Sequence, residues 1–198
     1  QGILPDVITC SALMTAIRKC NEPELAVRVF SIMQDQGMVP DVVTYGTLIG
    51  ILGDSTQPER AIAVFDAMQR QEVLPTEVAY NSLITAIGKS KLPERALQVF
   101  EAMKLQGVVP DVITYNALIS ACEKGKQPEG ALQVFQALKL QGVVPDVITY
   151  NALISACEKG NRSERALEVF AAMKLQGVVL DVITYNACIN ACEKGQQP

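Results

Sequence analysis

Apolar side chains recur along the chain every three or four residues, and polar side chains fill the positions between them. One such run consists of Val147, Tyr150, Leu153, Ile154 and Cys157. This spacing places the five side chains on one face of an α-helix. Either Asp146 or Thr149 can supply the oxygen that caps the start of the helix, and Gly160 is expected to end it in the left-handed conformation.

A second apolar run follows after a short polar segment and consists of Ala166, Val169, Phe170 and Met173. We expect this second helix to begin at Ser163 and, in other parts of the chain, at a first-turn proline such as Pro58, Pro93 or Pro128. An acidic residue stands in its first turn, where it meets the positive end of the helix dipole. Gly177 is expected to end it. The pattern predicts a hairpin of two amphipathic helices.

This hairpin repeats with a period of 35 residues. Residues 105–125 and 140–160 are identical, and the period also aligns all five phenylalanines and all five tyrosines. A single hairpin cannot bury its apolar face, but stacked hairpins share a continuous core. The sequence therefore predicts an all-α fold, a right-handed superhelical α-solenoid with its first helices on the inside.

We expect residues 1–198 to form one solenoid. Its predicted repeats are 7–41, 42–76, 77–111, 112–146 and 147–181, with a partial repeat at 182–198 and the tail of a preceding repeat at 1–6. Natural solenoids carry polar caps at both ends, and neither end shows one here. The expectation is a piece of a longer protein, and no targeting peptide is visible in it.

Composition narrows the possible functions. The formal net charge is −4, which argues against a protein that holds nucleic acid by non-specific charge alone. The chain has no histidine, the commonest general base and metal ligand. No paired carboxylates, nucleophile elbow or phosphate loop is present. We predict no enzymatic activity, no cofactor, no metal and no insertion into a membrane.

The six cysteines are interpreted as small apolar residues. Cys122, Cys157 and Cys192 occupy one position of the repeat. Successive copies are expected about 10 Å apart, the spacing of packed helices, which is too far for a disulfide. Reduced structural thiols are the expectation.

The 35-residue unit resembles the pentatricopeptide repeat family, in its P-type form. The resemblance rests on DVxTYNxLI in the first helix and AxxVFxxMxxxGxxP in the second, and it covers the whole chain. The tetratricopeptide repeat has a shorter period and a tryptophan near its start, and neither is present here. The resemblance implies an inner surface that binds single-stranded RNA at one nucleotide per repeat, mostly in mitochondria or chloroplasts.

The resemblance also implies which side chains read the bases. The residue after the tyrosine of each first helix meets the base edge; these residues are Ser11, Asn81, Asn116, Asn151 and Asn186. The residue that closes each repeat orients it; these residues are Asp41, Asp111, Asp146 and Asp181. An asparagine amide offers a donor and an acceptor, and a neighbouring carboxylate can fix its direction.

By resemblance, asparagine with aspartate favours uracil and serine with aspartate favours guanine, so the predicted target is 5′-G-N-U-U-U-3′. The second repeat carries Gly46 and Thr76 at these two positions, which match no usual combination. The asparagines Asn116 and Asn151 have a simpler interpretation as helix caps or solvated surface groups.

The family also holds each base between aliphatic side chains, here Ile8, Val43, Val78, Ile113, Ile148 and Ile183. These residues could equally pack between hairpins. Lysines near the end of the first helices, suited to phosphates, are Lys19, Lys89, Lys124, Lys159 and Lys194, with Asp54 in the second repeat. A lysine in the last turn also complements the helix dipole, so this signal is weak alone.

Two functions remain open. The first is sequence-selective binding of U-rich single-stranded RNA in an organelle, for RNA processing or stabilisation. The second is a structural subunit that docks other proteins within a large organellar complex, such as a ribosome or a membrane-bound assembly, and reads no RNA. The acidic charge balance and the irregular second repeat favour this alternative somewhat.

Overall fold

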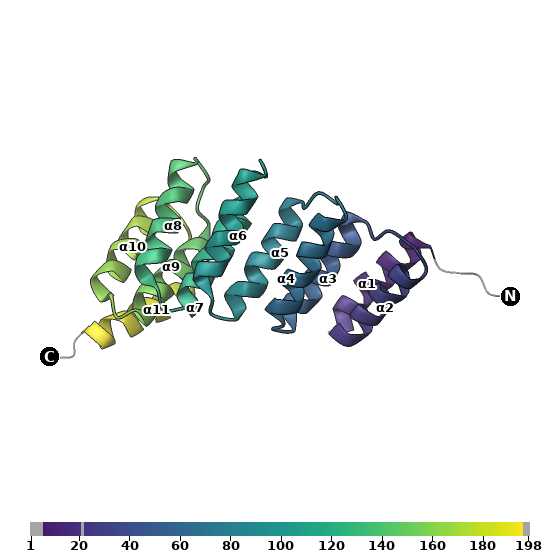
Figure 1. Ribbon diagram of the computed structural model, residues 1–198. Helices are drawn as coiled ribbons and strands as arrows, with labels where there is room; N and C mark the ends of the chain where they lie inside the picture. The colour runs from purple at the N-terminus through teal and green to yellow at the C-terminus, as the bar shows by residue number, and fades with distance from the viewer. Residues whose placement is uncertain (1–5, 21, 196–198) are drawn as a thin grey trace.

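The computed structural model describes residues 6–20 and 22–195, and within them the chain forms eleven α-helices and no strands (Figure 1). The helices are α1 (Val7–Cys20), α2 (Pro23–Asp35), α3 (Val42–Asp54), α4 (Pro58–Arg70), α5 (Glu77–Lys89), α6 (Pro93–Leu105), α7 (Val112–Lys124), α8 (Pro128–Leu140), α9 (Val147–Lys159), α10 (Ser163–Leu175) and α11 (Val182–Gly195). The prediction of an all-α superhelical solenoid is confirmed.

The odd-numbered and even-numbered helices form two layers. Each odd-numbered helix packs on the next, from α1 to α11, whereas the backbones of the even-numbered helices in the described chain pack only against odd-numbered ones. Small residues allow the odd-numbered helices to approach one another closely. A Cβ added at Gly53 would lie 2.7 Å from the Cβ of Ala86, and one at Gly88 would lie 2.8 Å from that of Ala121. The closer spacing makes the odd-numbered layer the inner side of the curve.

The core repeats one aromatic contact at every junction. The phenylalanine of a second helix meets the tyrosine of the next first helix edge to face, and the ring centroids of Phe65 and Tyr80 are 5.1 Å apart. Such pairs contribute about 0.5–1.5 kcal/mol beyond the area they bury. Tyr45, Tyr80, Tyr115 and Tyr150 are buried. Tyr185 is half exposed because no described helix packs on the far side of α11.

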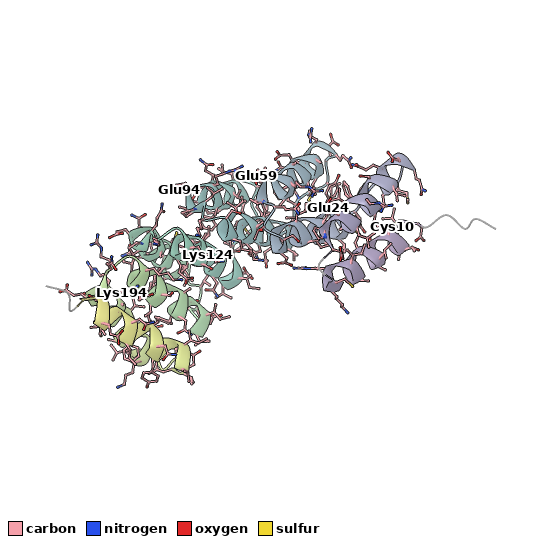
Figure 2. All side chains as sticks on the ribbon, turned by 90° about the horizontal axis from the view of Figure 1, so that it is seen from below. Cys10, Glu24, Glu59, Glu94, Lys124 and Lys194 are labelled. Carbon is pink, nitrogen blue, oxygen red and sulfur yellow. The ribbon has the colours of Figure 1, made fainter. Side chains whose placement is uncertain are left out.

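The second helices are also joined along their outer side. Figure 2 shows Glu24, Glu59 and Glu94 following one another along one side of the molecule. Glu24 forms an ion pair with Arg60 at 2.6 Å, and Glu59 forms one with Arg95 at 3.5 Å. These contacts are exposed to water, so they add little to stability.

The prediction that Gly160 ends its helix in the left-handed conformation is wrong. Gly160 has φ −88°, and the left-handed residue is Asn161, with φ 56°. A Cβ at Gly160 would overlap the ring of Pro128 in the preceding second helix. Glycine is required there by close packing. After the second helix the expectation holds, since Gly177 has φ 70°.

The cysteines of the core are inert. Burial raises the pKa of the Cys122 and Cys157 thiols to about 11, so both are protonated at neutral pH. Among residues 6–20 and 22–195, no group of three potential metal ligands comes together. No helix in the same part of the chain is long and apolar enough to span a bilayer.

Candidate nucleic-acid interface

The asparagines predicted to read bases lie on the inner helices α5, α7 and α9. Each one follows the buried tyrosine of its helix. The tyrosine points into the core, so the next side chain, about 100° further around the helix, points toward the inner side of the junction with the following repeat. Asn81 is nearly buried there, whereas Asn116 and Asn151 are half buried.

The side-chain amide of Asn116 is held at both ends by the next repeat. Its Nδ2 donates to Asp146 Oδ1 at 3.2 Å, and its Oδ1 accepts from the hydroxyl of Thr149 at 2.6 Å. A carboxylate cannot donate a proton, so the NH₂ group must face Asp146 and the carbonyl must face Thr149. One N–H and one lone pair of the amide stay free for a ligand. This is the orientation by aspartate that the resemblance implies.

Asp146 and Thr149 also build the start of α9. The Thr149 N–H donates to Asp146 Oδ1 at 2.8 Å, and the Asp146 N–H donates to Thr149 Oγ1 at 3.1 Å. Both oxygens expected as caps therefore act together in a capping box. The asparagine itself caps nothing, so the alternative interpretation of Asn116 as a helix cap is wrong.

The hydroxyl of Thr149 has one proton and two acceptors. Asn116 Oδ1 lies 2.6 Å and Asp146 Oδ1 lies 2.9 Å from Thr149 Oγ1. The shorter distance favours donation to the asparagine. Sequence analysis identified this threonine only as a cap. Its fixed position in the DVxTYN motif of successive repeats is the sequence feature that could have indicated its second role, which is to hold the asparagine of the preceding repeat.

The same arrangement recurs in the neighbouring repeats. Asn151 Nδ2 donates to Asp181 at 3.2 and 3.1 Å, and its Oδ1 accepts from Thr184 at 2.6 Å. Asn81 Nδ2 donates to Asp111 at 3.3 Å, and its Oδ1 accepts from Thr114 at 2.7 Å. Three consecutive repeats therefore present an amide in one orientation.

Hydrogen bonds keep the aspartates that orient these asparagines negatively charged. Burial by itself raises the pKa of the Asp146 carboxyl, but the N–H and hydroxyl of Thr149 and the amide of Asn116 outweigh it, so the pKa lies below its usual value. The pKa of the Asp111 carboxyl is lowered by the same balance of causes. At neutral pH both are therefore anions that can only accept, as the fixed amide orientation requires.

The first repeat differs in its chemistry. The hydroxyl oxygens of Ser11 and Thr44 are 2.6 Å apart, and Thr44 Oγ1 donates to Asp41 Oδ1 at 2.7 Å. Ser11 is therefore connected to Asp41 through Thr44, not directly. At the other end, Asn186 lies exposed on α11, and its side chain makes no hydrogen bond with the described residues.

The second repeat lacks the polar side chains of the others. Gly46 leaves open space, since a Cβ there would meet nothing within 4 Å, and Thr76 makes no capping hydrogen bond. A hollow of about 270 Å³ lies beside this repeat, lined among others by Arg18, Gly50 and Asp54. This hollow is lined by Asn81 of the third repeat and not by Gly46, so at the position of the asparagine the second repeat has open space in place of an amide.

The aliphatic side chains predicted to sandwich bases are exposed. They are 56–78% exposed and comprise Ile8, Val43, Val78, Ile113, Ile148 and Ile183. Packing between hairpins, the alternative interpretation, would bury them, so it is wrong. An exposed aliphatic side chain once per repeat is available to contact a planar ligand.

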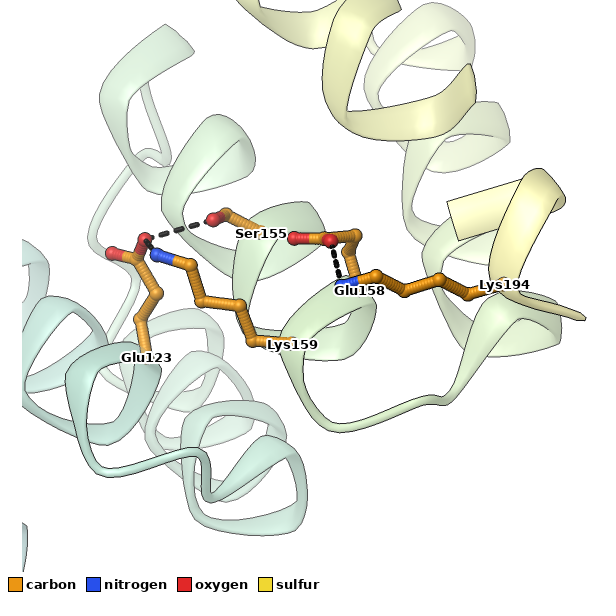
Figure 3. A network of polar contacts seen from close by, with 5 residues as sticks. All are labelled: Glu123, Ser155, Glu158, Lys159 and Lys194. Atoms are coloured by element: carbon orange, nitrogen blue, oxygen red, sulfur yellow. Dashed lines mark hydrogen bonds and ion pairs between the residues drawn. The ribbon is translucent and has the colours of Figure 1, made fainter. Parts of the chain in front are cut away.

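Acidic residues of the preceding repeat neutralise much of the predicted lysine row. Lys159 Nζ is 2.6 Å from Glu123, whose carboxylate also accepts from Ser155, and Lys194 pairs with Glu158 (Figure 3). In the second repeat the exceptional Asp54 binds Lys89 at 2.8 Å.

The two remaining lysines differ from these. Burial lowers the pKa of the Lys124 ammonium, against an opposing effect of Glu123 and with smaller effects from the charges of Lys89 and Lys159. The effects of Lys89 and Lys159 on the pKa of Lys124 indicate that lysines of successive repeats lie close enough to repel one another. Lys19 is exposed on α1. The predicted lysine row is therefore present, but three of its five charges are paired with carboxylates.

These features define a helical-repeat protein with an ordered asparagine amide on its inner face in three consecutive repeats. Models of the family match most of the chain: "Pentatricopeptide repeat domain" matches residues 63–125 and 98–162, "PPR repeat family" matches 5–54 and 145–194, and "PPR repeat" matches 43–73. The chain belongs to the pentatricopeptide repeat family. No curated protein sequence matches it.

Solved structures of this family are similar to the chain. The pentatricopeptide repeat protein PPR10 in complex with an 18-nt psaJ RNA element is 28% identical over 96% of this chain, with a TM-score of 0.82. The structure of PPR10 from maize without a stated ligand is 27% identical over 99% of this chain, with a TM-score of 0.77. In both cases the chain spans 28% of the length of PPR10.

A more distant structure shares the fold. The PPR domain of Arabidopsis thaliana protein-only RNase P 1, solved in complex with tRNA, is 15% identical over 92% of this chain and 96% of that domain, with a TM-score of 0.78. Both this domain and PPR10 were therefore solved with RNA bound.

Proposed function

We propose that the inner face of this solenoid binds single-stranded RNA and reads one base per repeat. The observation that carries the proposal is the fixed amide of Asn81, Asn116 and Asn151 in three consecutive repeats. Each amide keeps one free N–H and one free lone pair. The Watson–Crick edge of uracil offers an acceptor and a donor that match them.

The aliphatic row supplies the second part of the site. A base placed opposite Asn116 can lie between the exposed side chains of successive repeats, such as Ile113 and Ile148. Contact with both faces of the base is independent of its identity, so it adds affinity while the amide adds selectivity. With the serine of the first repeat, the proposed target is 5′-G-N-U-U-U-3′.

The proposed role is occupancy of a short U-rich segment in an organelle, for RNA processing or stabilisation. PPR10, whose structure contains RNA, supports the binding part of this proposal. The organellar location rests on the resemblance to the family. The charge pattern points to modest affinity, because the lysines that face phosphates are largely ion-paired within the protein.

A fluorescence-anisotropy titration tests the proposal. Labelled GAUUUU RNA is compared with a purine-only RNA and with the equivalent DNA, each at two salt concentrations. We expect preference for the U-rich RNA and its loss in a variant with Asn116→Ala and Asn151→Ala. Each lost base contact costs about 1–3 kcal/mol by analogy with base readout in general.

A matched variant controls for the loss of two amides. Gln98→Ala with Gln133→Ala removes two exposed amides from the second helices and should leave RNA affinity unchanged. Equal binding of all three nucleic acids, or none, would exclude base reading. That result would favour the second candidate, a protein-docking subunit of an organellar complex. The net charge of −4 and the paired lysines support this candidate.

A further inference from the structure

The turns after the second helices form an exposed apolar edge. We call this the turn edge, and it consists of Leu105, Val109, Leu140, Val144, Leu175 and Val179. These six side chains are 77–89% exposed, more than nearly all other large apolar residues of the described chain. Contiguous apolar patches of this kind on soluble proteins mark sites of interaction.

Local geometry explains why these side chains point outward. At the end of α6, the Val108 N–H donates to the Met103 carbonyl at 3.1 Å and folds the chain back on the helix. Met103 is buried and Val108 packs against the core, so the flanking Leu105 and Val109 are left outside. The turns after α8 and α10 have the same sequence and the same hydrogen bonds.

The edge recurs over three successive repeats. The even-numbered helices form one layer (Figure 1), and their turns follow one another along it once per repeat, although the even-numbered helices of the described chain do not pack directly on one another. Each turn contributes a leucine and a valine four residues apart. The turn edge therefore repeats with the 35-residue period and uses none of the base-reading side chains.

The charge along the turn edge has one sign. Residues 104–109, 139–144 and 174–179 all read Lys-Leu-Gln-Gly-Val-Val, with one lysine and no acidic residue. Lys104 pairs with Glu101 at 2.8 Å, whereas Lys139 and Lys174 form no ion pair with any described residue. A molecule with a net charge of −4 thus has a positive row beside its most exposed leucines.

The first two repeats do not continue this pattern. Where the later turns have leucine and glycine, the first has Asp35 and the second has Arg70 and Glu72. Exposed aliphatic residues continue into these turns as Val39 and Leu74, but the combination of a lysine with a following exposed leucine is confined to the turns after α6, α8 and α10.

We propose that the turn edge docks this protein on the surface of an anionic lipid bilayer. Leucine and valine side chains gain free energy at the boundary between headgroups and acyl chains, while adjacent lysines stay at the level of the phosphates. Two copies joined by this row would bring their lysines together. Charge complementarity therefore favours the lipid.

Vesicle flotation tests this proposal with the 198-residue chain. The protein is mixed with vesicles of phosphatidylcholine alone or with phosphatidylglycerol added. We expect flotation with the anionic vesicles, and a variant with Leu105→Gln, Leu140→Gln and Leu175→Gln should reduce the bound fraction about tenfold or more. Replacing Lys104, Lys139 and Lys174 by glutamine should remove the preference for anionic lipid.

A control variant removes three aliphatic side chains elsewhere. Leu25→Gln, Ile32→Gln and Leu167→Gln change partly exposed residues of the second helices, and this variant should float as well as the parent. Two results would overturn the proposal: absence of flotation with anionic vesicles, or equal flotation of the triple leucine variant. A parent that is dimeric by light scattering, does not float and becomes monomeric in the leucine variant would show instead that the edge joins two copies. RNA affinity is expected to be unchanged in the leucine variant, which separates this test from that of the proposed function.

Discussion

In three consecutive repeats, one threonine hydroxyl lies between an asparagine carbonyl and an aspartate carboxylate. Thr149 therefore caps its own helix and orients Asn116 of the preceding repeat. An asparagine alone is an ambiguous reader, because its amide can turn over and exchange donor for acceptor. Contacts at both ends remove that freedom before a ligand arrives, which lowers the entropic cost of binding.

We predict that Thr149→Val weakens RNA binding more than it weakens the fold. The substitution removes the hydroxyl but keeps the branched shape, so about 1 kcal/mol of stability is lost while the amide of Asn116 becomes free to turn. Affinity for the U-rich RNA should fall about threefold to tenfold, measured by anisotropy beside a urea unfolding curve. Thr15→Val, which removes an exposed hydroxyl bonded only to the Ser11 carbonyl, is the control and should leave affinity unchanged.

At the scale of the helices, small residues decide how closely the inner layer packs. A Cβ at Gly88 would lie 2.8 Å from the Cβ and 3.2 Å from the Cα of Ala121 on the neighbouring helix. Backbone atoms cannot move aside as a flexible side chain can. The curvature that makes the inner face concave thus depends on particular glycine and alanine residues at the contacts.

Two glycine-to-alanine substitutions should therefore have opposite effects. Gly88→Ala overpacks the contact between α5 and α7 and should cost about 1–3 kcal/mol. Gly46→Ala lies in the helix α3 with open space around it and should stabilise by about 0.5–1 kcal/mol, because alanine has less backbone freedom to lose. The midpoints of urea unfolding measure both. If Gly88→Ala unfolds at the same urea concentration as the parent, α5 and α7 can move apart without loss of stability.

At the scale of the whole molecule, ion pairs between repeats restrain the interaction with RNA. Glu123 and Glu158 form ion pairs with Lys159 and Lys194, two of the lysines proposed to contact phosphates. The side chains of Glu123 and Glu158 are 17% and 12% exposed, and those of their partners Lys159 and Lys194 are 42% and 47% exposed. Both pairs also lower the positive electrostatic potential of the inner face.

We predict that Glu123→Gln combined with Glu158→Gln raises RNA affinity about threefold to tenfold at low salt and steepens its salt dependence, because freed lysines release more counterions. The net charge rises from −4 to −2, since two carboxylates are removed. Glu59→Gln with Glu94→Gln changes the net charge equally on the outer helices. If this control raises affinity as much, the position of the carboxylates has no importance.

The sequence by itself determined the hairpins, their period and the aromatic core. Apolar spacing sets each helix locally, and a stack of repeats needs only contacts between neighbours, so a 35-residue period leaves few other folds. Phe65 and Tyr80, 15 residues apart, meet as their repeat positions predict. The sequence also identified the inner asparagines, by resemblance to the family.

The contacts between neighbouring repeats, in contrast, could be known only from the tertiary structure. Gly160 is a glycine because of the Pro128 ring in the preceding second helix, and the left-handed conformation falls on Asn161. Lys159 is paired with Glu123, and Leu140 and Leu175 project into solvent. The first two of these contacts join atoms about one repeat apart, brought together by the stacking angle of the helices. Local periodicity specifies each helix, but it does not specify that angle.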